Sequence, residues 1–247
     1  AQYNYLPNAT GGVVDDLIVY QLKDQEYLLG VNASNIEKDW NHLLKHNQNF
    51  NANIRDVSDD TALMAIQGPQ TVAAMDVLCS SDLKLLSNYS HTTTTFAGVE
   101  DVLVATTGYT GAGGIEIYFP ATEAVKVWNA VMEAGDKYGI LPIGLAARDT
   151  LRLEMGYCLY GNEINDETCP ISAGLGWVTR PHTGFLMAHH HQKSLEAGTE
   201  SKLVGIQITE RGIPRAGYKI CDTEENTIGK ISSGTQSPSL NRGIGLG

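Results

Sequence analysis

Residues 108–119 read GYTGAGGIEIYF, a glycine-rich turn that runs directly into a strand of alternating side chains. Successive strand residues point to opposite faces, so Glu116 and Tyr118 share one face while the apolar residues share the other. A phosphate-binding loop needs a helix after its glycines, and the strand here argues against nucleotide binding. Glu116 leaves two interpretations open: a solvated hairpin face, or a pocket carboxylate that accepts paired N–H donors from a flat heterocycle.

The segments around this strand predict a mixed fold. We expect strands over 13–21, 27–33, 61–68, 101–107 and 115–119, and helices over 36–46, 70–78, about 125–135 and 141–155. After Pro170 the pattern changes to a helix or linker over 186–200 and short strands over 203–209, 217–221 and 228–233. This order predicts an α+β domain followed by the start of a β-barrel.

The composition excludes several classes of protein. Of the 247 residues, 42% are hydrophobic and 18% are charged, as in a folded chain with a sizeable core. No run approaches the roughly 20 apolar residues that cross a membrane. The net charge of −11 would repel a phosphate backbone, which argues against general nucleic-acid binding. The four cysteines form no CxxC pair, which favours reduced thiols in a cytosol-like compartment.

Two carboxylates, Asp15 and Asp16, interrupt the apolar run VVDDLIVYQ at 13–21. Alternation places one of them toward the interior or a cleft and the other toward solvent, in either order. A carboxylate buried in a strand is costly unless it is paired or used. The pair therefore indicates either a site for chemistry or a structural carboxylate that accepts backbone N–H groups.

The stretch GLAARDTLRLEMG at 144–156 predicts a helix with an apolar stripe. Arg148 lies at the edge of that stripe, where it either needs an acceptor or snorkels over the core. Asp149 and Arg152 are three residues apart, so we expect them to pair on the helix surface.

No metal or covalent chemistry is indicated. The histidines at 189–191 are successive and cannot converge on one ion from a helix, so we expect a solvated segment there and no metal site. Ser232-Ser233-Gly234 is not a nucleophile elbow, and no Ser or Cys lies in a nucleophile motif.

Seven segments taken together resemble the aminomethyltransferase of the glycine cleavage system, the T-protein family. In chain order they are GGVVDDLIVY (11–20), VNASNIEKDW (31–40), ALMAIQGPQ (62–70), GYTGAGGIEI (108–117), GLAARDTLRLEMGYCLYGNEI (144–164), PISAGLGWV (170–178) and SSGTQSPSLNRGIGLG (232–247). The resemblance implies a folate-binding region of two α/β portions with antiparallel sheets over 1–185, and the start of a C-terminal β-barrel over 199–247. Family members extend further at both ends.

The resemblance also implies the reaction. The family takes an aminomethyl group from the lipoyl arm of the carrier H-protein and gives 5,10-methylenetetrahydrofolate, ammonia and the dihydrolipoyl arm. Tetrahydrofolate is then a substrate, and neither a metal, a nucleic acid nor a membrane takes part. We expect a cytoplasmic location, or the mitochondrial matrix in a eukaryote.

The resemblance also implies roles for individual residues in these motifs. Asp16 matches the catalytic carboxylate near the reacting folate nitrogens, Glu116 the glutamate that holds the pterin ring, and Arg148 a folate-contacting arginine. Tyr3, Leu28, Asn32 and Trp177 fall in segments that line the folate cavity in the family. We expect residues 16, 116 and 148 to share one cavity.

Two alternatives remain at this point. One is a non-catalytic folate-binding relative of the iron–sulfur assembly type. The other is a folate-dependent demethylation module of the kind that accompanies flavoproteins, although the sequence carries no dinucleotide fingerprint.

Overall fold

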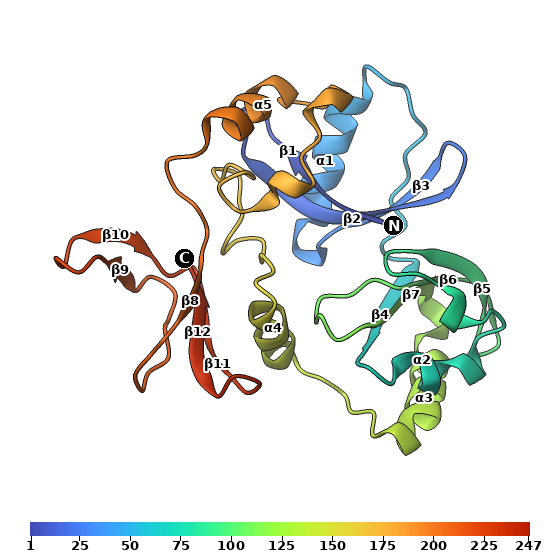
Figure 1. Cartoon of the computed structure of the whole chain (residues 1–247). Helices are drawn as coiled ribbons and strands as arrows, with labels where there is room; N and C mark the ends of the chain where they lie inside the picture. The colour runs from blue at the N-terminus through green and yellow to red at the C-terminus, as the bar shows by residue number, and fades with distance from the viewer. The chain divides into compact units, whose positions relative to one another are not determined.

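The chain, described over residues 1–247 in a computed structural model, folds as two units (Figure 1). Unit 1 consists of Ala1–Gln2, Val19–Leu28 and Trp40–Arg148. Unit 2 consists of Tyr3–Ile18, Leu29–Asp39 and Asp149–Gly247. Each unit is described by itself.

A four-stranded antiparallel sheet forms the frame of unit 1. Its strand order is β4-β7-β6-β5, with β4 at Thr61–Gln67, β5 at His91–Phe96, β6 at Val99–Ala105 and β7 at Gly114–Pro120. Helices α2 (Thr71–Met75) and α3 (Ala124–Gly135) pack against one face of this sheet. Short 3₁₀ turns lie at 76–78, 83–85, 121–123 and 136–138.

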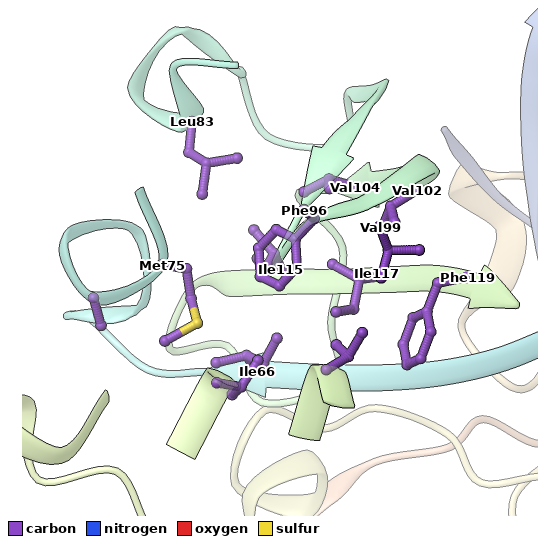
Figure 2. Packing of buried hydrophobic residues seen from close by; sticks show 13 residues of the cluster. Ile66, Met75, Leu83, Phe96, Val99, Val102, Val104, Ile115, Ile117 and Phe119 are labelled. Atoms are coloured by element: carbon purple, nitrogen blue, oxygen red, sulfur yellow. The ribbon is translucent and has the colours of Figure 1, made fainter. Parts of the chain in front are cut away.

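The core of unit 1 lies between that sheet and its helices. Ile115, Ile117 and Phe119 project in line from β7 into a cluster of buried apolar side chains (Figure 2). From α3, Val127 and Val131 enter the same cluster one turn apart. The opposite face of β7 is therefore left to Glu116 and Tyr118, as the alternation predicted.

A second, three-stranded sheet precedes this one in the chain, with strand order β1-β2-β3. Its strands are β1 (Gln2–Pro7), β2 (Val13–Lys23) and β3 (Glu26–Gly30). A 3₁₀ turn at Ala33–Asn35 then leads into helix α1 (Ile36–Asn47). The first half of β2 and the first turn of α1 belong to unit 2 and carry most of the residues of interest.

The rest of unit 2 combines short helices with two small sheets. The helices are α4 (Leu145–Glu154), whose first residues belong to unit 1, and α5 (Ala188–Ala197), with 3₁₀ turns at 175–177 and 181–183. The strands are β8 (Gly205–Gln207), β9 (Lys219–Cys221), β10 (Thr227–Lys230), β11 (Ser233–Ser237) and β12 (Arg242–Leu246). They form an antiparallel β11-β12-β8 sheet and a β10-β9 ribbon.

One arginine of α4 behaves opposite to expectation. Arg152 is fully buried, and its guanidinium pairs with Glu163 and donates to Ser233 on β11. The prediction of a surface pair was therefore wrong for Arg152, although Asp149 does accept from its Nε at 2.8 Å. Arg148, expected at the edge of an apolar stripe, is exposed.

The histidine segment also differs from expectation. Residues 189–191 lie in α5, and His191 is fully buried beside Tyr5 and Phe185, with ring centroids 6.0 and 5.8 Å away. The prediction of a solvated segment was therefore wrong for His191. No helix of the structure has the length and apolarity needed to span a bilayer.

Candidate active site

The two aspartates of β2 take different environments. Asp15 is fully buried, whereas Asp16 is only partly buried. The strand that carries them is set by its first residues: Val13 N donates to Asn165 O, and a Cβ on Gly12 would lie 1.8 Å from Asp166 O. Only glycine allows this approach, so the motif GGVVDD fixes where both carboxylates lie.

Asn32 joins the two carboxylates. Its Nδ2 lies 2.9 Å from Oδ1 of Asp15 and 3.0 Å from Oδ1 of Asp16, and its backbone N donates to Asp15 Oδ2. Asn35 adds a further donor to Asp15 at 2.7 Å. Asp15 thus accepts from three N–H groups, which is the environment of a structural carboxylate.

Tyr3 holds the other oxygen of Asp16. Its hydroxyl donates to Asp16 Oδ2 at 3.0 Å, and its ring stacks on Trp177 with centroids 5.9 Å apart and an interplanar angle of 15°. Trp177 keeps 60% of its surface exposed. Both carboxylate oxygens of Asp16 are therefore held by hydrogen bonds, and the neighbouring Tyr3–Trp177 pair is partly exposed to solvent.

The protonation of Asp16 reflects opposing effects. Burial raises the pKa of its carboxyl above the ordinary value, and the neighbouring charge of Asp15 raises it further. The hydrogen bonds from Tyr3 and Asn32 lower it, because both stabilise the ionised form.

Unit 1 carries a second carboxylate, Glu116, at the centre of its sheet. Glu116 Oε2 accepts from the Thr107 hydroxyl, and that hydroxyl lies 3.1 Å from Tyr20 OH. Tyr20 OH in turn lies 3.3 Å from Tyr118 OH. Burial raises the pKa of Glu116, while the Thr107 hydrogen bond and the positive charge of Arg148 lower it. One carboxylate oxygen of Glu116, Oε2, is thus held by Thr107, whereas Oε1 accepts no hydrogen bond.

The glycine loop beside Glu116 is held by Gln67. The Gln67 amide donates to the carbonyls of Thr107 and Ile115, and its Oε1 accepts from Thr110. A Cβ on Gly108 would lie 1.9 Å from that Oε1. The conformation of the glycine loop therefore depends on Gln67, a residue that the sequence analysis did not single out.

Arg148 lies beside the same loop. Its guanidinium carbon is 4.7 Å from the ring centroid of Tyr109, within the range of a cation–π contact. Arg148 and Glu116 are close enough for the arginine to lower the carboxyl pKa, so unit 1 brings these two predicted residues together.

The predicted site residues thus form two groups. Tyr3, Asp16, Asn32 and Trp177 contact one another in unit 2, and Glu116 and Arg148 interact in unit 1. Leu28 is half-buried on β3. The shared cavity of residues 16, 116 and 148 stays a prediction. No group of three or more His, Cys, Asp or Glu residues is arranged to hold a metal ion.

Sequence reasoning missed four supporting residues: Asn35, Gln67, Thr107 and Tyr109. All lie within or next to quoted motifs, but each acts through a contact with a residue at least nine positions away. Only the polar character of Gln67 at the end of an apolar strand signalled a role in advance.

The sequence matches two family models. Residues 1–183 match the GCVT N-terminal domain, and residues 202–247 match the glycine cleavage T-protein C-terminal barrel domain. An aminomethyltransferase of Flavobacterium psychrophilum is 53% identical over 247 residues, covering 100% of this chain and 68% of that protein. One from Bacteroides thetaiotaomicron is 49% identical over 248 residues, with the same coverage.

A solved structure agrees with the sequence matches. Glycine cleavage system aminomethyltransferase T from Bartonella henselae superposes with a TM-score of 0.89 at 32% identity, covering 99% of this chain and 66% of that one. The fold is thus that of an α+β transferase with the first part of a barrel domain, which confirms the predicted fold class. The chain belongs to the glycine cleavage T-protein family.

Family membership confirms the predicted class of enzyme. Relatives that match the whole chain are named aminomethyltransferases, so neither the non-catalytic binder nor the demethylation module is favoured. The chain spans about two thirds of the length of these relatives.

Proposed function

We propose that this chain transfers the one-carbon unit of an S-aminomethyl-dihydrolipoyl H-protein to tetrahydrofolate, with Asp16 at the reacting carbon. The observation that carries the assignment is the fixation of Asp16. Both of its oxygens accept hydrogen bonds, from Tyr3 and Asn32, yet the side chain is not fully enclosed. A carboxylate that is held in place and still reachable is suited to stabilising charge on a substrate.

The chemistry needs such a charge. When the C–S bond of the aminomethyl thioether breaks, both electrons go to sulfur, which takes up a proton to give the dihydrolipoyl thiol. The remaining CH₂=NH₂⁺ carbon is electron-poor, and an ionised Asp16 stabilises its positive charge. One folate nitrogen attacks this carbon, and the second displaces ammonia to close the methylene bridge. Positioning the two substrates supplies much of the remaining acceleration, and no covalent enzyme intermediate is needed.

Glu116 and Arg148 are assigned to folate. A pterin presents adjacent N–H donors in one plane, and a carboxylate can accept both. The open Oε1 of Glu116 supports this role, since Oε2 is already engaged by Thr107. Arg148 offers a rigid fork of donors for a carbonyl or carboxylate oxygen. Tyr3, Leu28, Asn32 and Trp177 are assigned to folate binding as well.

The proposal extends to organisation and location. Residues 1–185 form the folate-binding region and 199–247 begin the barrel domain, and the lipoylated H-protein is the partner. The named relatives are bacterial, which supports a cytoplasmic location.

The decisive experiment replaces Asp16 with Asn. We expect Asp16→Asn to bind tetrahydrofolate with nearly normal affinity, but to lose at least about a hundredfold in ammonia release and methylenetetrahydrofolate formation from aminomethylated H-protein. Asp24→Asn, which changes an exposed aspartate in the β2–β3 turn, is the matched control and should leave both measurements unchanged. Normal turnover by Asp16→Asn would refute the catalytic role.

A further inference from the structure

A third carboxylate lies behind the pair on β2. Asp39, in the first turn of α1, is 1% exposed, and neither of its oxygens has a hydrogen-bond donor. It packs against Asp15, which is itself fully buried. Two buried carboxylates in contact cannot both carry a charge without a large cost.

The donors around the pair decide which residue is ionised. Asp15 accepts from the Asn32 backbone, the Asn32 amide and the Asn35 amide, whereas Asp39 accepts from no donor. A carboxyl group without donors finds a partner only if it holds a proton and becomes the donor itself. Asp15 is then the charged acceptor and Asp39 the neutral acid.

We propose that Asp39 is a positioning residue of this transferase, which holds one proton and donates it to Asp15 so that Asp15 and Asn32 keep the Asp16 carboxylate in place. This inference builds on the proposed role of Asp16. Asp39 does not hydrogen-bond Asp16, so its positioning effect runs through Asp15 and then Asn32, whose Nδ2 donates to both Asp15 Oδ1 and Asp16 Oδ1.

The charges around Asp39 agree with a retained proton. Burial, the hydrogen bond with Asp15 and the charge of Asp15 together raise the pKa of Asp39 to about 8, and the charge of Asp16 adds to the effect. Lys38 is the one cation that acts against them. Its ammonium already lies 2.5 Å from Tyr160 OH and 3.6 Å from Asp166, with the Tyr160 ring 4.0 Å away, so it is engaged on other partners.

A first test measures stability and needs no substrate. If folded Asp39 keeps a proton that the unfolded chain releases, raising the pH destabilises the wild type relative to Asp39→Asn. The ratio of their unfolding constants should rise about tenfold for each pH unit between pH 5 and 7. Glu37→Gln removes an exposed carboxylate from the same helix and should give a level ratio. A level ratio for Asp39→Asn as well would overturn the proposal.

A second test separates positioning from mere folding. Asp39→Asn keeps a neutral donor, so its kcat at pH 7 should stay within about threefold of the wild type, and the wild-type loss of kcat above pH 8 should disappear. Asp39→Leu removes the donor, and kcat should fall about tenfold or more while the KM for tetrahydrofolate changes little. Equal kcat values for the Leu and Asn variants, or an unchanged alkaline limb in Asp39→Asn, would overturn the positioning role.

The first test is independent of the proposed function, whereas the second measures turnover and depends on it. A wild-type protein that forms no methylenetetrahydrofolate would refute the transferase assignment, yet the pH dependence of unfolding would still report the proton on Asp39.

Discussion

Arg152 and Glu163 form an ion pair in which both side chains are completely buried, with Nη1 and Oε2 2.8 Å apart. Arg152 also donates to the Tyr157 carbonyl and the Ser233 hydroxyl, and Glu163 accepts from the Leu159 backbone and the Ser232 hydroxyl. Every strong polar group of the pair is thus satisfied, which is the condition under which a buried pair is tolerated. The network ties α4 to the strand region around β11.

Breaking that pair should destabilise the protein severely. Arg152→Ala leaves Glu163 buried and without its cation, and we expect a loss of about 3–5 kcal/mol in the free energy of unfolding. Urea denaturation followed by circular dichroism measures it. Arg148→Ala, in the same helix but exposed, is the matched control and should cost less than about 1 kcal/mol. Similar losses in the two variants would contradict the description of α4.

Removing the Tyr3 hydroxyl should move the pH dependence of catalysis. The hydrogen bond from Tyr3 lowers the pKa of Asp16, so Tyr3→Phe raises that pKa. Because the proposed mechanism needs ionised Asp16, the acid limb of kcat should shift to higher pH, with the largest loss below neutrality. The ring remains able to stack on Trp177, so the affinity for folate should change little.

The control for Tyr3→Phe is Tyr27→Phe, which removes an exposed hydroxyl from β3. Its pH–rate profile should coincide with that of the wild type. An acid limb that moved to lower pH in Tyr3→Phe would contradict the assigned direction.

Glu116→Gln should weaken folate binding. An amide keeps one acceptor oxygen but loses the charge, and a hydrogen bond to a charged group contributes about 1.5–3 kcal/mol. We expect the dissociation constant for tetrahydrofolate to rise by about tenfold to a hundredfold, as measured by calorimetric titration. Glu100→Gln, on the adjacent strand β6 and exposed, should leave the affinity unchanged. Equal affinities of Glu116→Gln and the wild type would remove Glu116 from the folate site.

The Gln67 clamp on the glycine loop can be tested by a double-mutant cycle. Gly108→Ala places a methyl group against Gln67 Oε1 and should cost about 1–3 kcal/mol of unfolding free energy. Gln67→Ala should cost a similar amount, because it leaves the Thr107 and Ile115 carbonyls without this donor. The double variant should lose less than the sum, since Gln67→Ala makes room for the methyl group. Strict additivity would show that the two residues do not interact.

The elements that the sequence predicted well are those with a clear apolar period. The alternation of 115–119 and the helical spacing of α3 correspond to faces that pack on a core, and the boundaries of β7, α1 and α3 were correct to within a few residues. Helix α4 begins at Leu145 rather than at residue 141. The apolar side chains of Leu141 and Ile143 are exposed, so no packing against a core extends the helix toward them.

Strands without an apolar period escaped prediction. β5 reads HTTTTF, so its threonines give no alternation and it is defined by its pairing with β6. β11 reads SGTQS, so it has no apolar residue and is defined by its pairing with β12. In such segments the partner strand, which is distant in sequence, carries the information.

For the candidate site, the sequence indicated which residue types and motifs are involved, but not the burial or the hydrogen-bond partners of each side chain. Spacing placed Asp15 and Asp16 on opposite faces and could not decide which one is enclosed. In the structure Asp15 is the enclosed one, and it accepts from Asn32 and Asn35, which follow β3 in the chain. The same holds for α4, where periodicity identified an amphipathic helix but only the position of Glu163 explains why Arg152 is the buried arginine.

Gly12 affects the proposed site through the position of the main chain, not through a side chain of its own. Any methyl group added there must push away the carbonyl of Asp166, and the strand that it displaces carries Asp15 and Asp16 only a few positions further on. Replacement of Gly12 by a larger residue should therefore reduce enzyme activity, even though Gly12 has no proposed contact with a substrate.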